Sequence, residues 1–245
     1  MKFDEKKFLK KIIKKTGKTI NRNNLISQGD CILIGLSGGK DSLALADILS
    51  ERRKKLPIHY CLKAVHIKLE GVKYSSDIDY LKNFCKKRNI EFLFHSEKIN
   101  LDGSKKNPCF YCSFSRRRIL FQYMKSLGCN KLALGHNMED AVETFFMNIL
   151  FRNRLSSLPY KLSMFNGEFE IIRPLLEIRE QYVEKYVRLN NLVTQQIKCP
   201  FENKSNRFKV RKMIESNEKF FEGFTEKVFY SMSKIDLEYL PGNFF

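Results

Sequence analysis

The sequence predicts an α/β fold with a doubly wound, mostly parallel sheet. Between residues 31 and 150, short apolar runs alternate with segments whose apolar residues recur at helical spacing. Strands that alternate with helices pair in parallel, and such a sheet is covered by helices on both faces. Because ligands bind beyond the carboxyl ends of parallel strands, we expect the binding site at that edge of the sheet.

The first predicted element is a basic amphipathic helix over residues 4–16. Its apolar residues, from Phe8 to Ile13, fall on one stripe, and lysines occupy the other face. Gly17 is expected to end this helix. The lysines would contact the phosphates of a partner or face solvent, and the sequence leaves both interpretations open.

The next elements alternate regularly. Residues 31–36 form a short apolar run with polar neighbours, which predicts a buried strand, and a helix over 42–54 follows it. A second strand is expected over 63–69 and an amphipathic helix over 77–88. Residues 91–95 predict a third strand.

The second half of the predicted sheet continues the same alternation. Residues 97–112 are expected to form a loop, and residues 113–127 a helix that stops at Gly128. A fourth strand over 131–134 precedes a helix over 138–150.

Asn166-Gly167 lies between two short β-like runs and predicts a hairpin. From Glu177 onward, apolar residues at helical spacing predict a mainly helical region. The expected division of the chain is a basic helical region over 1–28, a nucleotide-binding domain over 29–175 and a helical C-terminal region over 176–245.

The chain of 245 residues carries 45 Lys and Arg against 27 Asp and Glu, a formal net charge of +18. This excess favours a polyanionic partner, with RNA or DNA the obvious candidate. An AT-rich genome that writes lysine codons freely is the other explanation. No apolar run reaches the roughly 20 residues of a membrane span, and no signal peptide is recognisable, so a soluble, cytoplasmic protein without a membrane partner is expected.

The seven cysteines do not suggest a disulfide framework, because their number is odd and the chain looks cytosolic. Cys31, Cys61 and Cys85 lie in apolar stretches and are interpreted as inert core residues. Cys129 follows Gly128 at a predicted helix end and is assigned no role.

A predicted phosphate-binding loop follows the first strand, with the sequence Ser37-Gly38-Gly39-Lys40-Asp41-Ser42. Its glycines let the backbone approach a ligand, and the following helix directs N–H groups and its dipole at an anion. The spacing is not that of a Walker loop. The hexapeptide resembles the pyrophosphate loop of the ATP pyrophosphatase superfamily, whose members release pyrophosphate and adenylate an oxygen.

The stretch from Gly135 to Thr144 leaves the fourth strand and opens a helix, and it also resembles that superfamily. The resemblance implies that Gly135 lies against the nucleotide and that Asp140 belongs to the ATP and Mg²⁺ site. It also places the second strand near His66 against adenine. Glu143, one turn from Asp140, is either a supporting residue or a partner of the helix dipole.

Cys109 and Cys112 form a CxxC just before a predicted helix, and Cys199 lies far downstream. A lone CxxC also occurs in redox pairs and zinc sites. Three thiolates with an open position would suit a 4Fe-4S cluster with one free iron that binds hydrosulfide. No second CxxC completes a four-ligand zinc site.

The order of these motifs resembles the tRNA-cytidine 2-sulfurtransferase family. Besides the phosphate loop and the CxxC, the resemblance includes Arg116-Arg117-Arg118, Arg173-Pro174-Leu175 and the late Cys199, and it covers roughly residues 20–215. It implies that Cys109, Cys112 and Cys199 hold the cluster and that the target lies in the tRNA anticodon loop. The zinc fingers of the related 2-thiouridine branch are absent, yet so is a further cysteine found in many cytidine enzymes, so the nucleoside stays open.

The resemblance implies two half-reactions, in which ATP adenylates the C2 oxygen of a pyrimidine and sulfur then displaces AMP. Asp41, Arg116 and Asp140 are the predicted catalytic residues, with Arg116 alternatively a tRNA contact or a solvent-facing residue. Lys40 would neutralise phosphate charge. The residues expected to contact RNA phosphates are Arg117, Arg118, Arg207 and Arg211.

The expected cofactors are ATP, Mg²⁺ and a 4Fe-4S cluster. The expected partners are tRNA and a sulfur donor, either cysteine desulfurase-derived sulfur or inorganic sulfide, and a homodimer is left open. Three rival functions remain: a tRNA 2-thiouridine synthetase, a tRNA-lysidine synthetase-like ligase, and a non-catalytic RNA-binding module. The ligase would have no use for three cysteines, and the module would not need both nucleotide motifs.

Overall fold

The computed structural model describes residues 3–70, 76–98, 108–195 and 205–240, with only the backbone for 108–110. The chain divides into two compact units, Met1–Asn137 with Pro159–Lys204, and Met138–Leu158 with Ser205–Phe245. The helix that begins at Met138 is thus grouped with the C-terminal helices. The sequence-based boundaries after residues 28 and 175 do not coincide with the boundaries of these two units, and they stay predictions.

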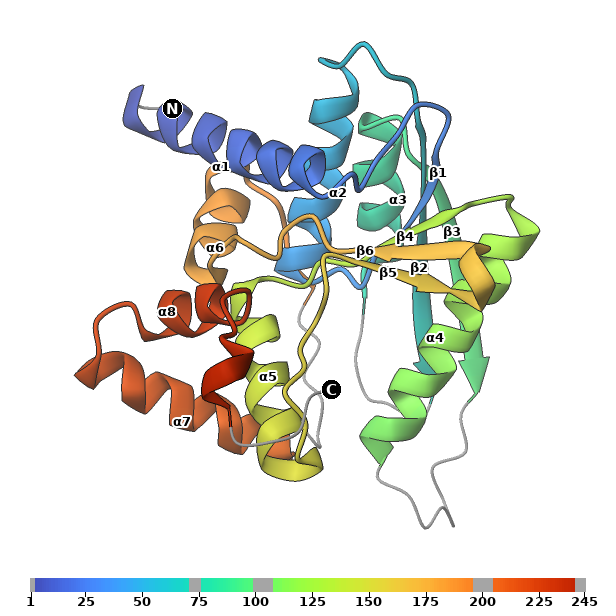
Figure 1. Ribbon diagram of the computed structural model, residues 1–245. Coiled ribbons are helices and arrows are strands. Elements are labelled where there is room, and N and C mark those ends of the chain that lie inside the picture. The colour runs from blue at the N-terminus through green and yellow to red at the C-terminus, as the bar shows by residue number, and fades with distance from the viewer. Residues whose placement is uncertain (1–2, 71–75, 99–107, 196–204, 241–245) are drawn as a thin grey trace. The chain divides into compact units, whose positions relative to one another are not determined.

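The first unit is built on a six-stranded sheet in the order β3-β2-β1-β4-β6-β5 (Figure 1). Within the described residues all neighbouring strands are parallel except β5 and β6, which run antiparallel. The predicted fold class is confirmed. The strands are β1 (Cys31–Gly35), β2 (Cys61–Glu70), β3 (Glu91–Lys98), β4 (Lys131–Ala133), β5 (Lys161–Met164) and β6 (Phe169–Ile172).

Helices cover both faces of this sheet. They are α1 (Phe3–Arg22), α2 (Lys40–Arg53), α3 (Ile78–Lys87), α4 (Pro108–Ser126) and α6 (Glu180–Leu189). Successive residues of β1 point to opposite faces. Ile32 and Ile34 therefore pack in one cluster with apolar residues of α1, α2, α3 and α6, whereas Leu33 packs with Ile119 and Met124 of α4. The sheet is doubly wound, as predicted.

The hairpin expected at Asn166-Gly167 is confirmed. β5 and β6 pair antiparallel around a short 3-10 turn, Phe165–Gly167. Asn166 and Gly167 have φ angles of 56° and 94°. Asn and Gly tolerate this left-handed region better than other residues, which explains their position in the turn.

The expected end of the first helix at Gly17 is wrong, because α1 continues to Arg22. Gly17 is buried, and a Cβ added there would lie 2.3 Å from a guanidinium nitrogen of Arg52 in α2. The two helices approach closely at this glycine. Tertiary packing therefore carries the helix through a residue that is unfavourable in isolated helices.

The expected loop over 97–112 is wrong at both ends. β3 continues to Lys98, and α4 already begins at Pro108. Proline suits the first position of a helix, because its φ is fixed near the helical value and its missing N–H would have no intrahelical partner. Cys109 and Cys112 consequently lie in the first turns of α4 and not on a loop before it. Residues 99–107 lie outside the described ranges.

Cys31 and Cys61 form a disulfide, contrary to the expectation of inert core thiols. They are direct register partners of the parallel strands β1 and β2, with a Cα–Cα distance of 4.7 Å. This separation lies within the range that a disulfide spans. Cys85 is buried as expected, and burial raises the pKa of its thiol to about 12.

The second unit is mainly helical in its described part. It contains α5 (Met138–Arg152), α7 (Asn206–Phe220) and α8 (Phe224–Ser231). Phe146 of α5 stacks on Phe224 of α8 with a centroid distance of 6.0 Å. The Ser205 hydroxyl accepts the Phe208 N–H at 3.2 Å and so caps α7.

Across the described ranges, no helix combines the length and the apolar character that crossing a bilayer requires.

Candidate functional site

The loop between β1 and α2 has the backbone of an anion cradle. Gly38 has a φ of +86°, a conformation that favours glycine. The Ser42 hydroxyl accepts the Gly38 N–H at 3.2 Å and donates to the Gly39 oxygen at 3.0 Å, so the loop is held by its own serine. Gly39 is the N-cap of α2 and has no side chain with which to cap it. The start of α2 thus suits an anionic ligand.

Lys40 places its ammonium group between two carboxylates at this loop. It lies 2.6 Å from Glu180 of α6 and 3.4 Å from Asp41. Burial by itself would lower the Lys40 pKa, but the two carboxylates outweigh it, and the pKa is raised. Lys40 therefore stays charged at neutral pH and is suited to neutralise a phosphate.

Asp41 is oriented by the loop that leaves β4. The Asn137 side-chain amide, which is nearly fully buried, donates to its carboxylate at 3.0 Å. Nearby, Arg173 contacts His136 at 3.2 Å and donates to the Pro159 oxygen at 2.7 Å. Burial lowers the pKa of Arg173 to about 10. The predicted Arg173-Pro174-Leu175 motif thus supports the loop after β4.

Gly135 lies directly against the phosphate loop. A Cβ added there would lie 2.9 Å from the carbonyl carbon and oxygen of Asp41 and 3.0 Å from the Ser42 nitrogen. These are backbone atoms that cannot rotate away. The backbone after β4 therefore sets the position of the loop after β1, whereas contact between Gly135 and the nucleotide stays a prediction.

Replacement of Gly135 by Ala is expected to weaken ATP binding about 100-fold, because a displaced loop loses its geometry toward phosphate. Isothermal titration calorimetry measures this affinity. The matched control is Gly35→Ala, whose Cβ would meet only the side-chain ends of Leu134 and Leu120, the nearest at 3.2 Å. Equal affinity of the Gly135→Ala variant and the unchanged protein would contradict the assigned contact.

The side chain of His66 has a structural role. It is only 1% exposed, its Nδ1 lies 2.8 Å from the Leu36 oxygen, and its Nε2 lies 2.9 Å from the Ser76 hydroxyl. Burial lowers its pKa, and the charge of Arg116 adds to this. The neutral ring thus donates from Nδ1 and accepts at Nε2, which ties β2 to the entrance of the phosphate loop. The expected backbone contact with adenine is untested.

Sequence reasoning missed three partners of the loop: Asn137, Glu180 and Gln195. The Gln195 N–H donates to the Gly38 oxygen at 2.9 Å, and its side-chain oxygen accepts the Asp77 N–H at 2.7 Å. Gln195 thus links the phosphate loop to the start of α3. Gln195 and Glu180 lie far along the chain from the loop and stand in no recognisable motif, so only the fold reveals them.

The CxxC lies on the first turns of α4, which follows β3. Cys112 is half-buried, and Cys109 precedes it by three residues on the same helix. The helix dipole favours thiolate at this end. The donor set therefore fits a soft metal centre. Cys199 lies outside the described residues.

Arg116, Arg117 and Arg118 follow on α4. Arg116 is half-buried and lies one turn beyond Cys112, whereas the other two are exposed. Arg118 pairs with Glu97, and Arg117 donates to the Ser113 oxygen at 3.3 Å. Both exposed arginines are accessible to an anionic partner, and their predicted RNA contact is untested.

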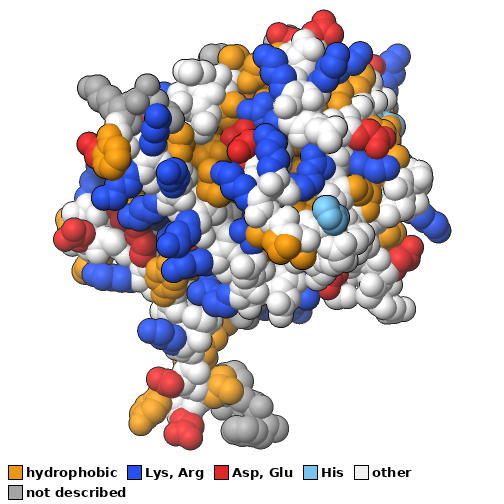
Figure 2. Space-filling model, turned by 90° about the horizontal axis from the view of Figure 1, so that it is seen from above, with side chains coloured by type: hydrophobic (Ala, Val, Ile, Leu, Met, Phe, Trp, Pro, Cys, Tyr) orange, Lys and Arg blue, Asp and Glu red, His pale blue; other side chains and the backbone are white. Residues whose placement is uncertain are grey.

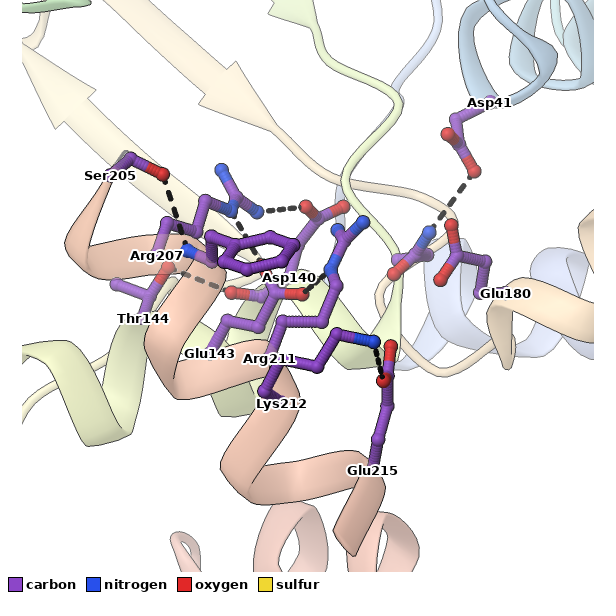
Figure 3. A network of polar contacts seen from close by, with 12 residues as sticks. Asp41, Asp140, Glu143, Thr144, Glu180, Ser205, Arg207, Arg211, Lys212 and Glu215 are labelled. Atoms are coloured by element: carbon purple, nitrogen blue, oxygen red, sulfur yellow. Dashed lines mark hydrogen bonds and ion pairs between the residues drawn. The ribbon is translucent and has the colours of Figure 1, made fainter. Parts of the chain in front are cut away.

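In the second unit, Arg207 and Arg211 of α7 pair with acids of α5 (Figure 3). Arg207 contacts both Asp140 and Glu143, and Arg211 lies 2.6 Å from Glu143. The Glu143 side chain is only 2% exposed, so these arginines neutralise a buried charge. Burial opposes the charge of Arg207, but the two acids raise its pKa. RNA contact by Arg207 and Arg211 stays a prediction. In the structure both arginines form ion pairs with acids of α5.

The fold and the loop define the class of protein. The family model described as "PP-loop domain" matches residues 6–216. The chain is therefore a PP-loop protein.

More specific relatives come from the curated proteins. A tRNA-cytidine(32) 2-sulfurtransferase of Aliivibrio fischeri (strain MJ11) is 34% identical over 94% of this chain and 76% of its own length. One of Dichelobacter nodosus (strain VCS1703A) is 33% identical over 96% of this chain and 89% of its own length. Within the PP-loop proteins, the chain belongs to the tRNA-cytidine 2-sulfurtransferase family, a family of sulfur-transferring enzymes.

Solved structures agree. The U34-tRNA thiolase NcsA from Methanococcus maripaludis, described with its 4Fe-4S cluster, has a TM-score of 0.79 and 27% identity, and the match covers 98% of this chain and 82% of that one. NMN synthetase from Francisella tularensis has a TM-score of 0.50 and 14% identity over 99% and 100% of the two chains, which shows the shared fold alone.

Proposed function

We propose that this protein thiolates C2 of a tRNA pyrimidine, most specifically an anticodon-loop cytidine, in an ATP-dependent reaction. One observation carries the proposal: the phosphate loop follows β1 and the CxxC helix follows β3, and these strands are parallel in one sheet. Their carboxyl ends therefore lie at one edge, where ligands of such sheets bind. A nucleotide loop and a thiolate pair at one edge suit an enzyme that activates an oxygen and replaces it with sulfur.

The first half-reaction is adenylation. The C2 oxygen of the pyrimidine attacks the α-phosphorus of ATP, an O–P bond forms, and pyrophosphate leaves with the electron pair of the broken bond. The start of α2 and the Lys40 ammonium hold the departing pyrophosphate. Asp140 is the carboxylate proposed to belong to the Mg²⁺ site. Asp41 is proposed to act in catalysis at the phosphate loop. Arg116 neutralises charge on the phosphates.

The second half-reaction exchanges oxygen for sulfur. Cys109, Cys112 and Cys199 would hold a 4Fe-4S cluster, which supplies bound sulfur as the nucleophile toward C2. AMP leaves with the former C2 oxygen. Asn137 keeps Asp41 in place and Gly135 keeps the loop close, so these two residues hold the phosphate loop in position for the reaction.

The substrate surface is basic. Along α1 the lysines at positions 6, 7, 10, 11, 14 and 18 are exposed. Figure 2 shows Lys and Arg side chains spread over the face seen from above, with fewer acidic ones among them. Together with the net charge of +18, this favours tRNA as the partner. The sulfur donor is proposed to be cysteine desulfurase-derived sulfur or inorganic sulfide, and the place of action the cytoplasm.

Binding of tRNA should be strongly salt-dependent, because contacts to phosphates release counterions. We expect the affinity to fall at least about 100-fold between about 50 and 200 mM salt. Fluorescence anisotropy with a labelled, unmodified tRNA measures it, and unrelated tRNAs should bind with similar affinity. An affinity that is flat over this range would show that the basic surface has another purpose.

A uridine target is the second candidate, supported by the similarity to the U34-tRNA thiolase. Nucleoside analysis of tRNA from cells with and without the gene separates the two. Loss of 2-thiocytidine alone supports the proposal, and loss of 2-thiouridine alone supports the alternative. Iron content distinguishes both from a tRNA-lysidine synthetase-like ligase, and tRNA-stimulated pyrophosphate release distinguishes them from a non-catalytic RNA-binding module.

A further inference from the structure

A second group of cysteines lies at the amino edge of the sheet. Cys31 is the first residue of β1, Cys61 is the first residue of β2, and Cys129 lies two residues before β4. Since β1 lies between β2 and β4, Cys31 has a cysteine on either side. The phosphate loop follows the opposite end of β1, about 13 Å away for the rise of a five-residue strand. This group is therefore separate from the proposed ATP site.

The backbone holds these three residues in register. The Cys61 N–H donates to the Asp30 oxygen at 2.9 Å, and the Asn130 N–H donates to the Cys31 oxygen at 3.0 Å. The Asn130 side-chain oxygen in turn accepts the Cys31 N–H at 2.9 Å. Each cysteine, or its direct neighbour, is thus fixed to an adjacent strand, so the sulfur atoms meet without any rearrangement of the backbone.

Two of the sulfur atoms are bonded and the third is in contact with them. Cys31 and Cys61 form a disulfide, and Cys129 Sγ lies 3.2 Å from Cys31 Sγ. Cys61 is exposed, Cys31 is half-buried, and Cys129 is only 2% exposed. The three therefore form a path from solvent to the core, with Cys31 in the middle.

We propose that Cys31, Cys61 and Cys129 form a thiol–disulfide site, which small two-electron oxidants such as hydrogen peroxide modify and in which Cys31 exchanges its partner between Cys61 and Cys129. The exposed Cys61 thiolate attacks peroxide, an S–O bond forms, the O–O bond breaks, and water leaves. The protonated product is the sulfenic acid of Cys61. Cys31 then attacks its sulfur, the S–S bond forms, the S–O bond breaks, and the leaving hydroxide takes up the Cys31 proton to give a second water. Two thiols are oxidised and one peroxide is reduced.

The exchange step needs no further oxidant. Cys129, as thiolate, attacks Cys31 Sγ, the new S–S bond forms, and the Cys31–Cys61 bond breaks. Cys61 leaves with the electron pair and takes up a proton from solvent, to which it is exposed. Burial raises the pKa of Cys129 despite the nearby Lys63, so its reactive form is scarce. Exchange should therefore be slow, and the Cys31–Cys61 form, which the structure shows, is expected to be the major one.

The test is disulfide mapping on the full-length protein, prepared anaerobically and exposed to hydrogen peroxide. Free thiols are blocked with N-ethylmaleimide in denaturant, so that buried thiols react as well, and pepsin digestion at acid pH prevents later exchange before mass spectrometry. We expect a major Cys31–Cys61 cross-link and a minor Cys31–Cys129 cross-link, while Cys85 remains alkylated as a buried internal control. Cys129→Ser should keep only the first cross-link, Cys61→Ser only the second, and Cys85→Ser both.

Specific results of this experiment would overturn the proposed thiol–disulfide site. A Cys31→Ser variant in which Cys61 and Cys129 cross-link as fully as in the unchanged protein would overturn the central role of Cys31. If that variant does not fold, the Cys61→Ser and Cys129→Ser variants decide, because both retain Cys31. Absence of any cross-link among the three, or a stoichiometric zinc or copper ion that Cys61→Ser releases, would show that the group is not a thiol–disulfide site.

Discussion

Replacement of Lys40 or Asp41 by Ala should lower tRNA-stimulated pyrophosphate release about 100- to 1,000-fold, the usual cost of removing a group that stabilises charge in a transition state. Lys40 keeps its positive charge beside two carboxylates and stands at the start of α2, where an anion binds best. Asp41 is held by Asn137 in one orientation. Both effects should appear in turnover, measured by a coupled pyrophosphate assay.

The fold should survive both changes. The Lys40–Glu180 pair is partly exposed, and pairs of this kind contribute at most about 1 kcal/mol to stability. Lys54→Ala is the matched control, because Lys54 lies at the other end of the same helix and its side chain is 57% exposed. It should leave turnover unchanged. Undiminished turnover in both the Lys40→Ala and Asp41→Ala variants would refute the assignment of the loop.

Replacement of Cys109, Cys112 or Cys199 by Ala is expected to remove iron and the thiolated nucleoside together. Three thiolates are the smallest set that holds a 4Fe-4S cluster with one open iron, so loss of any one leaves an incomplete site. Iron and sulfide are counted in anaerobically purified protein, and the nucleoside is measured in tRNA from cells that carry each variant.

Cys85→Ala is the control for this series, since its thiol is buried and has a pKa of about 12. Ala at Cys31, Cys61 or Cys129 should also leave the cluster and the nucleoside intact, because these residues lie at the other edge of the sheet. Stoichiometric zinc without iron, or a full cluster in the Cys199→Ala variant, would show that the ligand assignment is wrong.

The elements that were predicted correctly from the sequence are those that a few neighbouring residues specify. The apolar run of β1 followed by two glycines and a lysine predicts strand, loop and helix within a dozen or so positions, because burial, backbone freedom and dipole agree there. The hairpin at Asn166-Gly167 is likewise encoded by two residues that tolerate left-handed backbone conformations.

The predictions from sequence fail where a contact between residues far apart in the chain determines the local structure. α1 passes Gly17 because Arg52 of another helix packs against it, and no neighbouring residue signals this. Cys31 and Cys61 meet because two strands pair in one register, which periodicity alone does not set. Asn137, Glu180 and Gln195 become parts of the phosphate loop only in the folded chain. The pairing of the α7 arginines with acids of α5 is likewise visible only in the folded chain, and their RNA contact stays a prediction.

The most direct test of the proposed reaction is a reconstituted assay under anaerobic conditions. Protein with its full iron content is mixed with unmodified tRNA, sulfide, Mg²⁺ and ATP, and the digested nucleosides are measured by mass spectrometry alongside AMP. We expect 2-thiocytidine only when ATP is present, in an amount equal to the AMP and the pyrophosphate released. A thiolated nucleoside formed without ATP, or AMP formed with no thiolated nucleoside, would contradict the proposed reaction.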